Sequence, residues 1–383
     1  MRVTARVSVT VALAALAALA PAAASANVSR QDVAGYVYVN DNTAPANTIA
    51  GFARHADGTL SALPGSPFSA GGSGLGSVTG SQGALQMAAH GRYLLAVDAG
   101  SDQISVLRIH RDGALTLVRD GVVSSNGVRP VSIAVHRRLV YVANAGAGGS
   151  DYTGFRLTRG GRLRPLADST VALPDSASPG DVLFNGTGTN LAGTRVGTGQ
   201  IDSFSVGADG RLTAAAGSPF AAQGPGPFGS EFRPTNPAEL YVSNAHGGAG
   251  NGTVSAFRVA SDGTLSSIGS SPFADLQTAP CWVEITHDGR FLFTVNTASS
   301  SISRYAITAD GSLRLLGSTP FREPTGLGPF DARLSPDGGT LWVVAPGRNV
   351  VSGFTVRGDD LTELASSPTP LPAGATPFGI VVN

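Results

Sequence analysis

Polar and reactive side chains occur near the start of several short apolar segments of this chain. Asp331 and Glu231 are carboxylates, the type of side chain that removes a proton from water in a hydrolytic reaction. Cys281 is a weaker candidate nucleophile, because no histidine and aspartate stand at a recognisable spacing to activate it. The candidate binding residues are Gln82, Arg129, Asp181, Cys281, Trp282 and Asp331, and slightly deeper along the same segments lie Glu231, Glu284 and Arg333.

Motifs for other chemistries are missing from the sequence. It has no G-x-S-x-G nucleophile elbow, no H-E-x-x-H and no spaced Cys/His set, and its glycine-rich segments do not join a strand to a helix. We therefore predict no metal and no cofactor. The two tryptophans are too few for the repeated docking motif of quinoproteins.

A repeated phrase predicts the elements that must position these residues. Asp-Gly-x-Leu or a close variant occurs seven times, at steps of 48 to 55 residues, and its leucines are Leu60, Leu115, Leu163, Leu212, Leu265, Leu313 and Leu361. A period of about 50 residues with four short strands per unit is typical of a β-propeller blade. The sequence therefore predicts an all-β, seven-bladed propeller with four antiparallel strands per blade.

One repeat shows the order of strands. Residues 280–285 and 291–296 are predicted to form the first and second strands, 302–307 the third, and 313–316 the start of the fourth. The Asp-Gly hairpin turn before the fourth strand needs the positive φ that glycine adopts easily. Phrases such as Gly65-Ser-Pro-Phe68 are predicted to follow the fourth strand and end its ladder.

The two ends of the chain complement each other. The first repeat begins at a second strand, 36–40, whereas 377–383 is a first strand with no repeat after it. We predict that residues 377–383 pair beside 36–40, so that one blade is built from both termini and the ring has no open edge. Residues 27–383 are then a single domain.

In a propeller the first strand of each blade lines the central channel. The loops that lead into these strands form one face, which we call the entrance face, and the candidate residues would converge there. Convergent polar groups in a concavity predict a binding site for a small molecule or carbohydrate. The alternative, which the sequence leaves open, is that they pair with one another around a water-filled channel.

The first 26 residues predict a secretory signal peptide. Arg2 and Arg6 precede an apolar run at 7–20 that is too short to span a bilayer, and Ala24-Ser25-Ala26 is a cleavage site. We expect a secreted or extracytoplasmic protein that begins at Asn27, has no membrane span and is a monomer. Its net charge near zero argues against nucleic acid as a partner.

The chain resembles the seven-bladed propeller lactonases, which include 6-phosphogluconolactonase-like and carboxymuconate cyclase-like proteins. The blade phrases and the segments 97–106 and 286–296 carry this resemblance over the whole mature chain, and residues 80–85 and 279–283 are similar to an exported bacterial branch. The resemblance implies a lactonase, a carboxylic-ester hydrolase.

The catalytic set that the resemblance implies is replaced in this chain. Family enzymes have arginine and histidine after the first-strand proline, and glutamate 16 residues after that arginine. Here these positions hold Cys281, Trp282 and Thr297, and a further family histidine corresponds to Gly83. Three functions stay open: a lactone or sugar-derivative hydrolase with a non-standard site at the channel entrance, a non-catalytic propeller that binds a small molecule, glycan or protein, and a structural module of the cell exterior.

Overall fold

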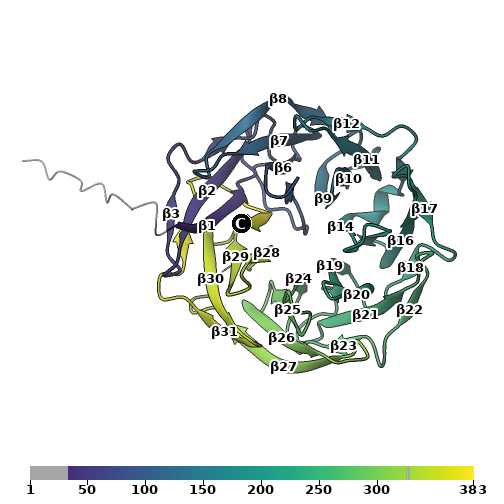
Figure 1. The fold of residues 1–383 in the computed structure, drawn as a ribbon. Helices are drawn as coiled ribbons and strands as arrows, with labels where there is room; N and C mark the ends of the chain where they lie inside the picture. The colour runs from purple at the N-terminus through teal and green to yellow at the C-terminus, as the bar shows by residue number, and fades with distance from the viewer. Residues whose placement is uncertain (1–32, 325, 327) are drawn as a thin grey trace, which may run out of the picture. The chain divides into compact units, whose positions relative to one another are not determined.

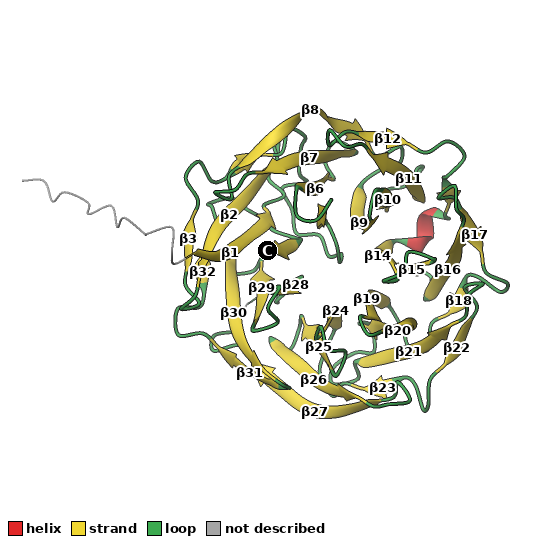
Figure 2. Ribbon diagram, in the orientation of Figure 1, coloured by secondary structure: helices red, strands yellow, loops and turns green. Residues whose placement is uncertain are grey.

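A computed structural model describes residues 33–324, 326 and 328–383 of the chain. The described residues from Val33 onward form seven antiparallel sheets arranged as blades around a centre (Figure 1). Strands and loops account for nearly all of them, and the helical segment shown in Figure 2 is the 3-10 turn η2 (Asp175–Ala177). The all-β, seven-bladed prediction is confirmed. The predicted signal peptide, 1–26, lies outside the described residues.

The blades follow one another along the chain, and we number them 1 to 7. Blade 1 contains β1 (Val33–Asn40), β2 (Thr48–His55), β3 (Leu60–Ala62), β4 (Phe68–Ser69) and β33 (Ile380–Val382). Blade 2 contains β5 (Leu85–Ala88), β6 (Tyr93–Asp98), β7 (Gln103–Ile109) and β8 (Leu115–Ser124). Blade 3 contains β9 (Pro130–His136), β10 (Leu139–Asn144), β11 (Asp151–Leu157), β12 (Leu163–Pro165) and β13 (Val171–Ala172). Blade 4 contains β14 (Pro179–Phe184), β15 (Asn190–Arg195), β16 (Gln200–Val206), β17 (Leu212–Ala214) and β18 (Phe220–Ala221).

The remaining three blades repeat this order. Blade 5 contains β19 (Pro227–Arg233), β20 (Asn236–Asn244), β21 (Thr253–Val259), β22 (Leu265–Ser267) and β23 (Phe273–Ala274). Blade 6 contains β24 (Pro280–Ile285), β25 (Phe291–Asn296), β26 (Ser301–Ile307) and β27 (Leu313–Pro320). Blade 7 contains β28 (Ala332–Leu334), β29 (Thr340–Ala345), β30 (Val350–Arg357), β31 (Asp360–Glu363) and β32 (Thr369–Pro370).

The first strands form the inner wall of the ring. Each of β5, β9, β14, β19, β24, β28 and β33 is the terminal strand of its sheet and contacts the first strand of the next blade. The fourth strands lie at the outer rim (Figure 1). This arrangement is the one that the sequence predicted, and it places most of the candidate residues on the inner wall, with Arg129 as an exception in the loop before β9.

One detail of the blades differs from the prediction. In blade 1 the Ser66-Pro67 turn does not end the ladder, because Phe68 pairs with Ile49 in β4 after the turn. Five blades have such a second short piece of outer strand, paired with the third strand. Proline lacks an amide hydrogen, so it interrupts the ladder only at its own position, and the pairing resumes beyond it.

The predicted closure of the ring is confirmed. Val37, Tyr38 and Val39 in β1 pair with Val382, Val381 and Ile380 in β33. The main-chain N–H of Tyr36 donates to the carbonyl of Asn383 at 3.1 Å, and the N–H of Asn383 donates back at 2.9 Å. Blade 1 is therefore built from both ends of the described chain.

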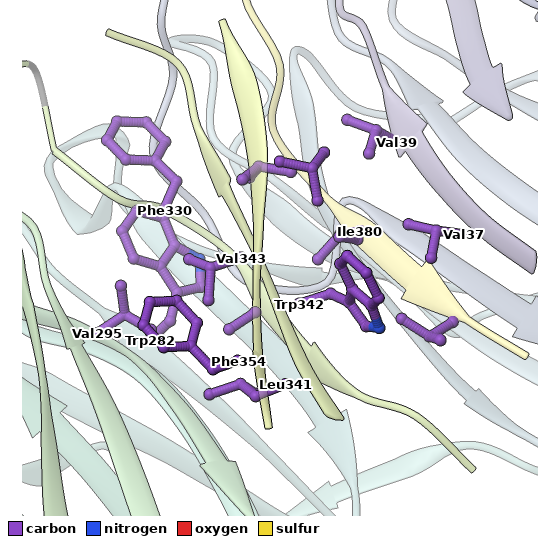
Figure 3. Packing of buried hydrophobic residues seen from close by; sticks show 14 of the residues in the cluster. Val37, Val39, Trp282, Val295, Phe330, Leu341, Trp342, Val343, Phe354 and Ile380 are labelled. Carbon is purple, nitrogen blue, oxygen red and sulfur yellow. The ribbon is translucent and has the colours of Figure 1, made fainter. Parts of the chain in front are cut away.

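The core lies between the blades. In its largest cluster, Trp282 lies beneath Phe330, and Trp342 lies beside Ile380 and Val37 (Figure 3). Both tryptophans are at most 2% exposed. Burial of aromatic and branched side chains against both neighbouring blades holds the ring together without a disulfide.

The repeated phrase has a structural role at the junctions between blades. The buried hydroxyl of Tyr38 donates to the carbonyl of Gly113, the glycine of the hairpin turn in the next blade, at 2.8 Å. Tyr141 does the same to Gly210 at 2.9 Å. Tyr241 and Gly311 repeat the contact at 2.9 Å. Among the described residues, no helix has the length and apolar character needed to cross a membrane.

Candidate functional site

A short segment of the chain fills the centre of the ring at the entrance face. It consists of Ser81, Gln82 and Gly83, which precede β5, and we call it the channel plug. All three residues are buried. The Ser81 hydroxyl donates to the carbonyl of Val131 in blade 3 at 2.6 Å, and the Gln82 N–H donates to the carbonyl of Gly180 in blade 4 at 3.0 Å.

The plug continues its contacts around the rest of the inner wall. Gln82 Nε2 donates to the carbonyl of Ser230 in blade 5 at 2.7 Å, and Gln82 Oε1 accepts from the N–H of Val283 in blade 6 at 3.0 Å. The N–H of Gly83 donates to Asp331 Oδ2, beside blade 7, at 3.4 Å. A tripeptide bonded to blades 3 to 7 can only lie across the channel, so the protein itself occupies the predicted entrance site.

Cys281 and Trp282 lie within the wall behind the plug. Trp282 is 1% exposed, stacks on Phe330 with ring centroids 4.7 Å apart, and donates its indole N–H to the carbonyl of Ser81 at 2.8 Å. Burial raises the pKa of the Cys281 thiol to about 12, so it is protonated at neutral pH and is no nucleophile there. A ligand could reach either side chain only if the plug moved.

Arg129 is separate from the other candidates. It is exposed in the loop before β9, where its guanidinium donates to the carbonyl of Ala145 at 2.7 Å and its main-chain N–H donates to Asp102 at 2.6 Å. In the described part of the chain no hydrogen bond or ion pair joins Arg129 to another candidate residue. The structure therefore places it at the edge of the entrance face.

Asp181 is connected to the plug through hydrogen bonds with Ser230. Its carboxylate is 2% exposed and accepts from the N–H and hydroxyl of Ser230 at 3.0 and 2.7 Å, and from the Ser132 hydroxyl at 3.2 Å. Burial raises the pKa of Asp181 to about 7, although the bonds from Ser230 and Ser132 favour the ionised form. Ser230 thus links Asp181 to Gln82, because its carbonyl accepts from the plug.

A charged layer follows on the side of the plug away from the entrance. Glu284 Oε2 accepts from Arg333 Nη1 at 3.2 Å, while Glu284 Oε1 accepts from the N–H of Leu334 in the next blade at 2.7 Å. Glu231 Oε2 accepts from the N–H of Ile285 at 2.6 Å in the same manner. Each glutamate therefore bridges its own inner strand to the following one.

The charges of this layer are strongly coupled. Burial raises the pKa of Glu231 well above its usual value, the negative charge of Glu284 raises it further, and Arg333 opposes both. Burial also raises the pKa of Glu284 and brings that of Asp331 to about 6, with Arg333 again opposing. Burial alone would lower the pKa of Arg333, but the surrounding carboxylates outweigh it and hold the guanidinium charged.

Two members of this layer keep access to solvent. The Arg333 side chain is 24% exposed, whereas that of Glu284 is 6% exposed. Glu231 is half-buried, and Asp331 is 1% exposed with both oxygens accepting main-chain N–H groups. Glu231 and Arg333 are thus the charged groups of the layer that a small molecule could contact.

The structure gives no metal-binding arrangement to these carboxylates. Within the described ranges, no group of three or more His, Cys, Asp or Glu side chains has the geometry to hold a metal ion. The carboxylate oxygens are directed instead at main-chain N–H groups, serine hydroxyls and Arg333. What this arrangement can do chemically is bind a polar molecule and exchange protons with it.

The positions where the resemblance implies a family catalytic set are brought together. Thr297 hydrogen bonds to the Cys281 side chain and donates from its hydroxyl to the carbonyl of Pro329 at 3.2 Å. Trp282 and Gly83 belong to the same region through their contacts with the plug and Asp331. Neutral groups therefore occupy the place at which the resemblance implies arginine, histidine and glutamate: Cys281 and Trp282 are buried, and Thr297 is half-buried.

Sequence reasoning missed the channel plug and its serine partners. The signal was the longest repeat step, 55 residues from Leu60 to Leu115, which contains the long connection from β4 to β5. The serines had no such signal, because serine is common in loops and strands alike. Only the folded ring brings Ser132 and Ser230 against one aspartate.

Comparisons with known proteins agree with this fold. Residues 189–378 match the profile of the family described as Lactonase, 7-bladed beta-propeller. A comparison with curated protein sequences gave no significant match. Among solved structures, a candidate 6-phosphogluconolactonase from Bacteroides uniformis has a TM-score of 0.74 at 21% identity, over 92% of this chain and 100% of that one.

Two further structures show the same architecture. A candidate 6-phosphogluconolactonase from Bacteroides fragilis has a TM-score of 0.72 at 21% identity, over 93% of this chain and 99% of that one. The periplasmic gluconolactonase of Pseudomonas aeruginosa has a TM-score of 0.71 at 18% identity, over 91% of this chain and 98% of that one. These identities support the fold alone. Together, the seven closed blades and the matching profile show that this chain belongs to the seven-bladed β-propeller lactonase family.

Proposed function

We propose that the protein is an exported lactonase that hydrolyses a lactone or related sugar derivative with Glu231 and Arg333. The observation that carries the proposal is the charged layer, in which a glutamate of raised pKa and a guanidinium both keep solvent access inside the ring. A carboxylate whose pKa is raised by burial holds a proton more readily than an exposed one, which suits it to proton transfer. The family profile and the lactonase names of structural neighbours support the reaction class.

The reaction follows from the charges. Ionised Glu231 accepts a proton from water while the water oxygen attacks the lactone carbonyl, and the carbonyl electrons move onto its oxygen. The Arg333 guanidinium offsets that negative charge. When the tetrahedral intermediate collapses, the ring C–O bond breaks, and the leaving oxygen takes the proton back from Glu231. The product is a hydroxy acid, with no oxidant or second substrate needed.

Glu231 is a better candidate than Asp331 for the base. Both Asp331 oxygens accept main-chain N–H groups, at 2.9 Å from Ala332 and 3.4 Å from Gly83, and its side chain has almost no exposed surface. Asp331 therefore positions the plug and balances Arg333. Glu231 has one oxygen bound to Ile285 N–H and keeps exposed surface.

Because the plug occupies the entrance, the proposed site lies further along the channel. Ser230 bonds to Gln82, and Glu231 is the next residue along β19, toward the turn at 234–235 that joins β19 to β20 on the face opposite the entrance. A substrate must therefore approach Glu231 from that face, or displace the plug. The site that we propose lies beneath the predicted entrance site.

A non-catalytic binding protein is the second candidate function. The observation in its favour is the plug itself, because its hydrogen bonds to five other blades close the place where the resemblance implies a substrate. A propeller closed in this way would bind a small molecule, glycan or protein on its surface. If the wild-type protein binds a ligand but hydrolyses no lactone of a broad panel, that result would favour the binding function.

Export is a separate part of the proposal, and it depends on Arg2, Arg6, the apolar run 7–20 and the Ala24–Ala26 cleavage pattern. Expression of the full chain in a secreting bacterial host, followed by N-terminal sequencing of extracytoplasmic protein, should give Asn27 as the first residue. Retention of an intact Met1 end in the cytoplasm would contradict export without affecting the hydrolytic proposal.

The test of hydrolysis uses a panel of sugar lactones and simple γ- and δ-lactones, followed by pH-stat titration of released acid. Glu231→Gln keeps the shape of the side chain and removes the base, and should lower kcat by about 10²-fold or more. Glu323→Gln, the same change at an exposed position, is the control and should keep the wild-type rate. An equal rate in Glu231→Gln and wild type would exclude Glu231 as the base.

A further inference from the structure

The outer rim carries a groove that has no connection with the charged layer of the channel. It has a volume of about 520 Å³ and lies where β8 of blade 2 meets β12 of blade 3, side by side at the rim in Figure 1. Four arginines line it, Arg108, Arg119, Arg162 and Arg164, together with Thr116 and Thr158. No aspartate or glutamate is among the lining residues.

The groove lies in a basic sector that the neutral net charge of the chain conceals. Residues 85–172, which form blades 2 and 3, contain eleven arginines and six aspartates. The other described residues contain twelve arginines and nineteen acidic residues. A field of one sign over two adjacent blades attracts ligands of the opposite sign even when the whole molecule is neutral.

Most of the positive charge in the groove is not neutralised by the protein. Arg162 Nη2 forms an ion pair with Asp120 at 3.0 Å, at an exposed position where such pairs are weak. For Arg108, Arg119 and Arg164, the described part of the chain supplies no ion pair and no side-chain hydrogen bond. Their guanidinium groups remain available to an external anion.

One of these arginines is held in place before any ligand arrives. The guanidinium of Arg108 lies 5.5 Å from the ring centroid of Tyr93, and the Tyr93 hydroxyl donates to the carbonyl of Arg159 in blade 3 at 2.9 Å. Tyr93 is 1% exposed, so its ring is fixed by the core. A guanidinium stacked on a fixed ring loses less freedom on binding an anion.

We propose that this groove binds an acidic oligosaccharide through its carboxylates. The planar guanidinium donates two parallel hydrogen bonds to a carboxylate, and the threonine hydroxyls can bond to sugar hydroxyls. Leu117, 41% exposed in the groove, offers an apolar surface to the face of a sugar ring. Single-stranded nucleic acid uses exposed aromatic rings for stacking, and none lines this groove.

The experiment titrates the protein with oligogalacturonate and follows binding by calorimetry at low ionic strength and at about 0.15 M salt, where charges are screened beyond about 8 Å. The fully methyl-esterified oligomer has the same backbone without charge and should not bind. Arg119→Gln/Arg164→Gln should weaken oligogalacturonate binding by about a hundredfold, since the charged hydrogen bond lost with each of the two arginines contributes about a factor of ten. Arg314→Gln/Arg357→Gln, two exposed arginines of blades 6 and 7, is the matched control and should bind like wild type.

Each alternative result overturns the proposal. Absence of oligogalacturonate binding at low salt, equal binding of the esterified oligomer, or equal affinity of the groove variant and its control would each exclude it. Tighter binding of oligothymidylate or polyphosphate than of oligogalacturonate would assign the groove to phosphate polymers instead. Because neither double variant touches Glu231 or Arg333, lactone turnover reports on the proposed enzyme function separately.

Discussion

Gln82 donates a hydrogen bond of 2.7 Å from its side-chain amide to the main-chain carbonyl of Ser230, which is 148 residues further along the chain. Gln82 precedes the first strand of blade 2, whereas Ser230 lies in the first strand of blade 5, on a different part of the ring. Such a bond exists only if the segment before β5 crosses the channel. It connects the plug to Ser230, whose N–H and hydroxyl bind Asp181 on the other side.

Gln82→Ala should weaken the plug. It removes one donor and one acceptor and leaves the carbonyl of Ser230 and the N–H of Val283 without their partner, which costs about 1–3 kcal/mol in the free energy of unfolding. The change should also open the path to Cys281 and speed its reaction with a thiol reagent. Gln103→Ala is the control, and equal thiol reactivity of the two variants would show that the plug does not shield Cys281.

Removal of residues 377–383 should lower the melting temperature by about 10 °C or more. The deletion takes away β33 and leaves the edge of β1 unpaired, so a closed ring becomes an open one. Gly35→Ala tests the same junction with one methyl group, because a Cβ there would lie 1.9 Å from the carbonyl oxygen of Asn383. Gly186→Ala meets nothing within 4 Å and should change the melting temperature little. If the truncated protein melted at the same temperature as the full-length protein, that result would contradict the closure.

Stability should fall as the pH rises from about 4 to about 7. The pKa of Asp181 and that of Asp41 are each raised by burial to about 7. In this range the unfolded chain loses these protons while the folded chain keeps them, so each added pH unit favours unfolding. Above about pH 7 the contribution is constant. Each shift of about three pKa units corresponds to about 4 kcal/mol per aspartate, measured by urea unfolding at several pH values.

Two comparisons isolate this effect. Asp181→Asn and Asp41→Asn should each flatten the pH profile. Asp57→Asn should not, because bonds from Thr59 lower the pKa of that exposed aspartate and move its titration below this range. Burial lowers the pKa of His136, which acts in the opposite direction but equally in every variant. A wild-type slope in Asp181→Asn would exclude Asp181 as a source.

Arg333→Gln should destabilise the protein by about 3–5 kcal/mol, because it leaves buried carboxylates without their cation. Glu284→Gln in the same chain should restore part of this loss, and a double-mutant cycle by chemical denaturation measures the coupling. Arg290→Gln removes an exposed partner of Asp288 and should cost under about 1 kcal/mol. Additive losses from Arg333 and Glu284 would show that the pair is not coupled.

Much of the fold could be predicted from local sequence because turns and strands depend on nearby residues. The seven hairpin phrases specify the positive φ of glycines such as Gly113 and Gly311. The closure could be predicted from the two ends of the chain. Residues 36–40 form a second strand that lacks a first strand, and 377–383 form a first strand that lacks a second, so in a closed ring the two must pair. The hydrogen bond from Tyr38 to Gly113 could not be foreseen, because it depends on how one blade packs on the next.

The candidate site was predicted less well. Glu231, Glu284, Arg333, Asp181 and Asp331 do converge on the inner wall, because every first strand lines it. Arg129 stays at the edge, and Cys281 and Trp282 face into the wall, where neighbouring blades cover them. Position along a strand fixes the height of a residue in the channel, but the direction of its side chain depends on the bulges and contacts of the folded sheet.

By itself the sequence determined the number of blades, the order of their strands and the pairing of the chain ends, since these depend on repeated turn chemistry and strand patterning. Only the tertiary structure decided that Ser81–Gly83 closes the channel. It also decided that Arg333 interacts electrostatically with four carboxylates, and that arginines of two blades line one groove. Those features join residues far apart in the chain, and hydrogen bonds, burial and charge act over distances in space rather than along the sequence.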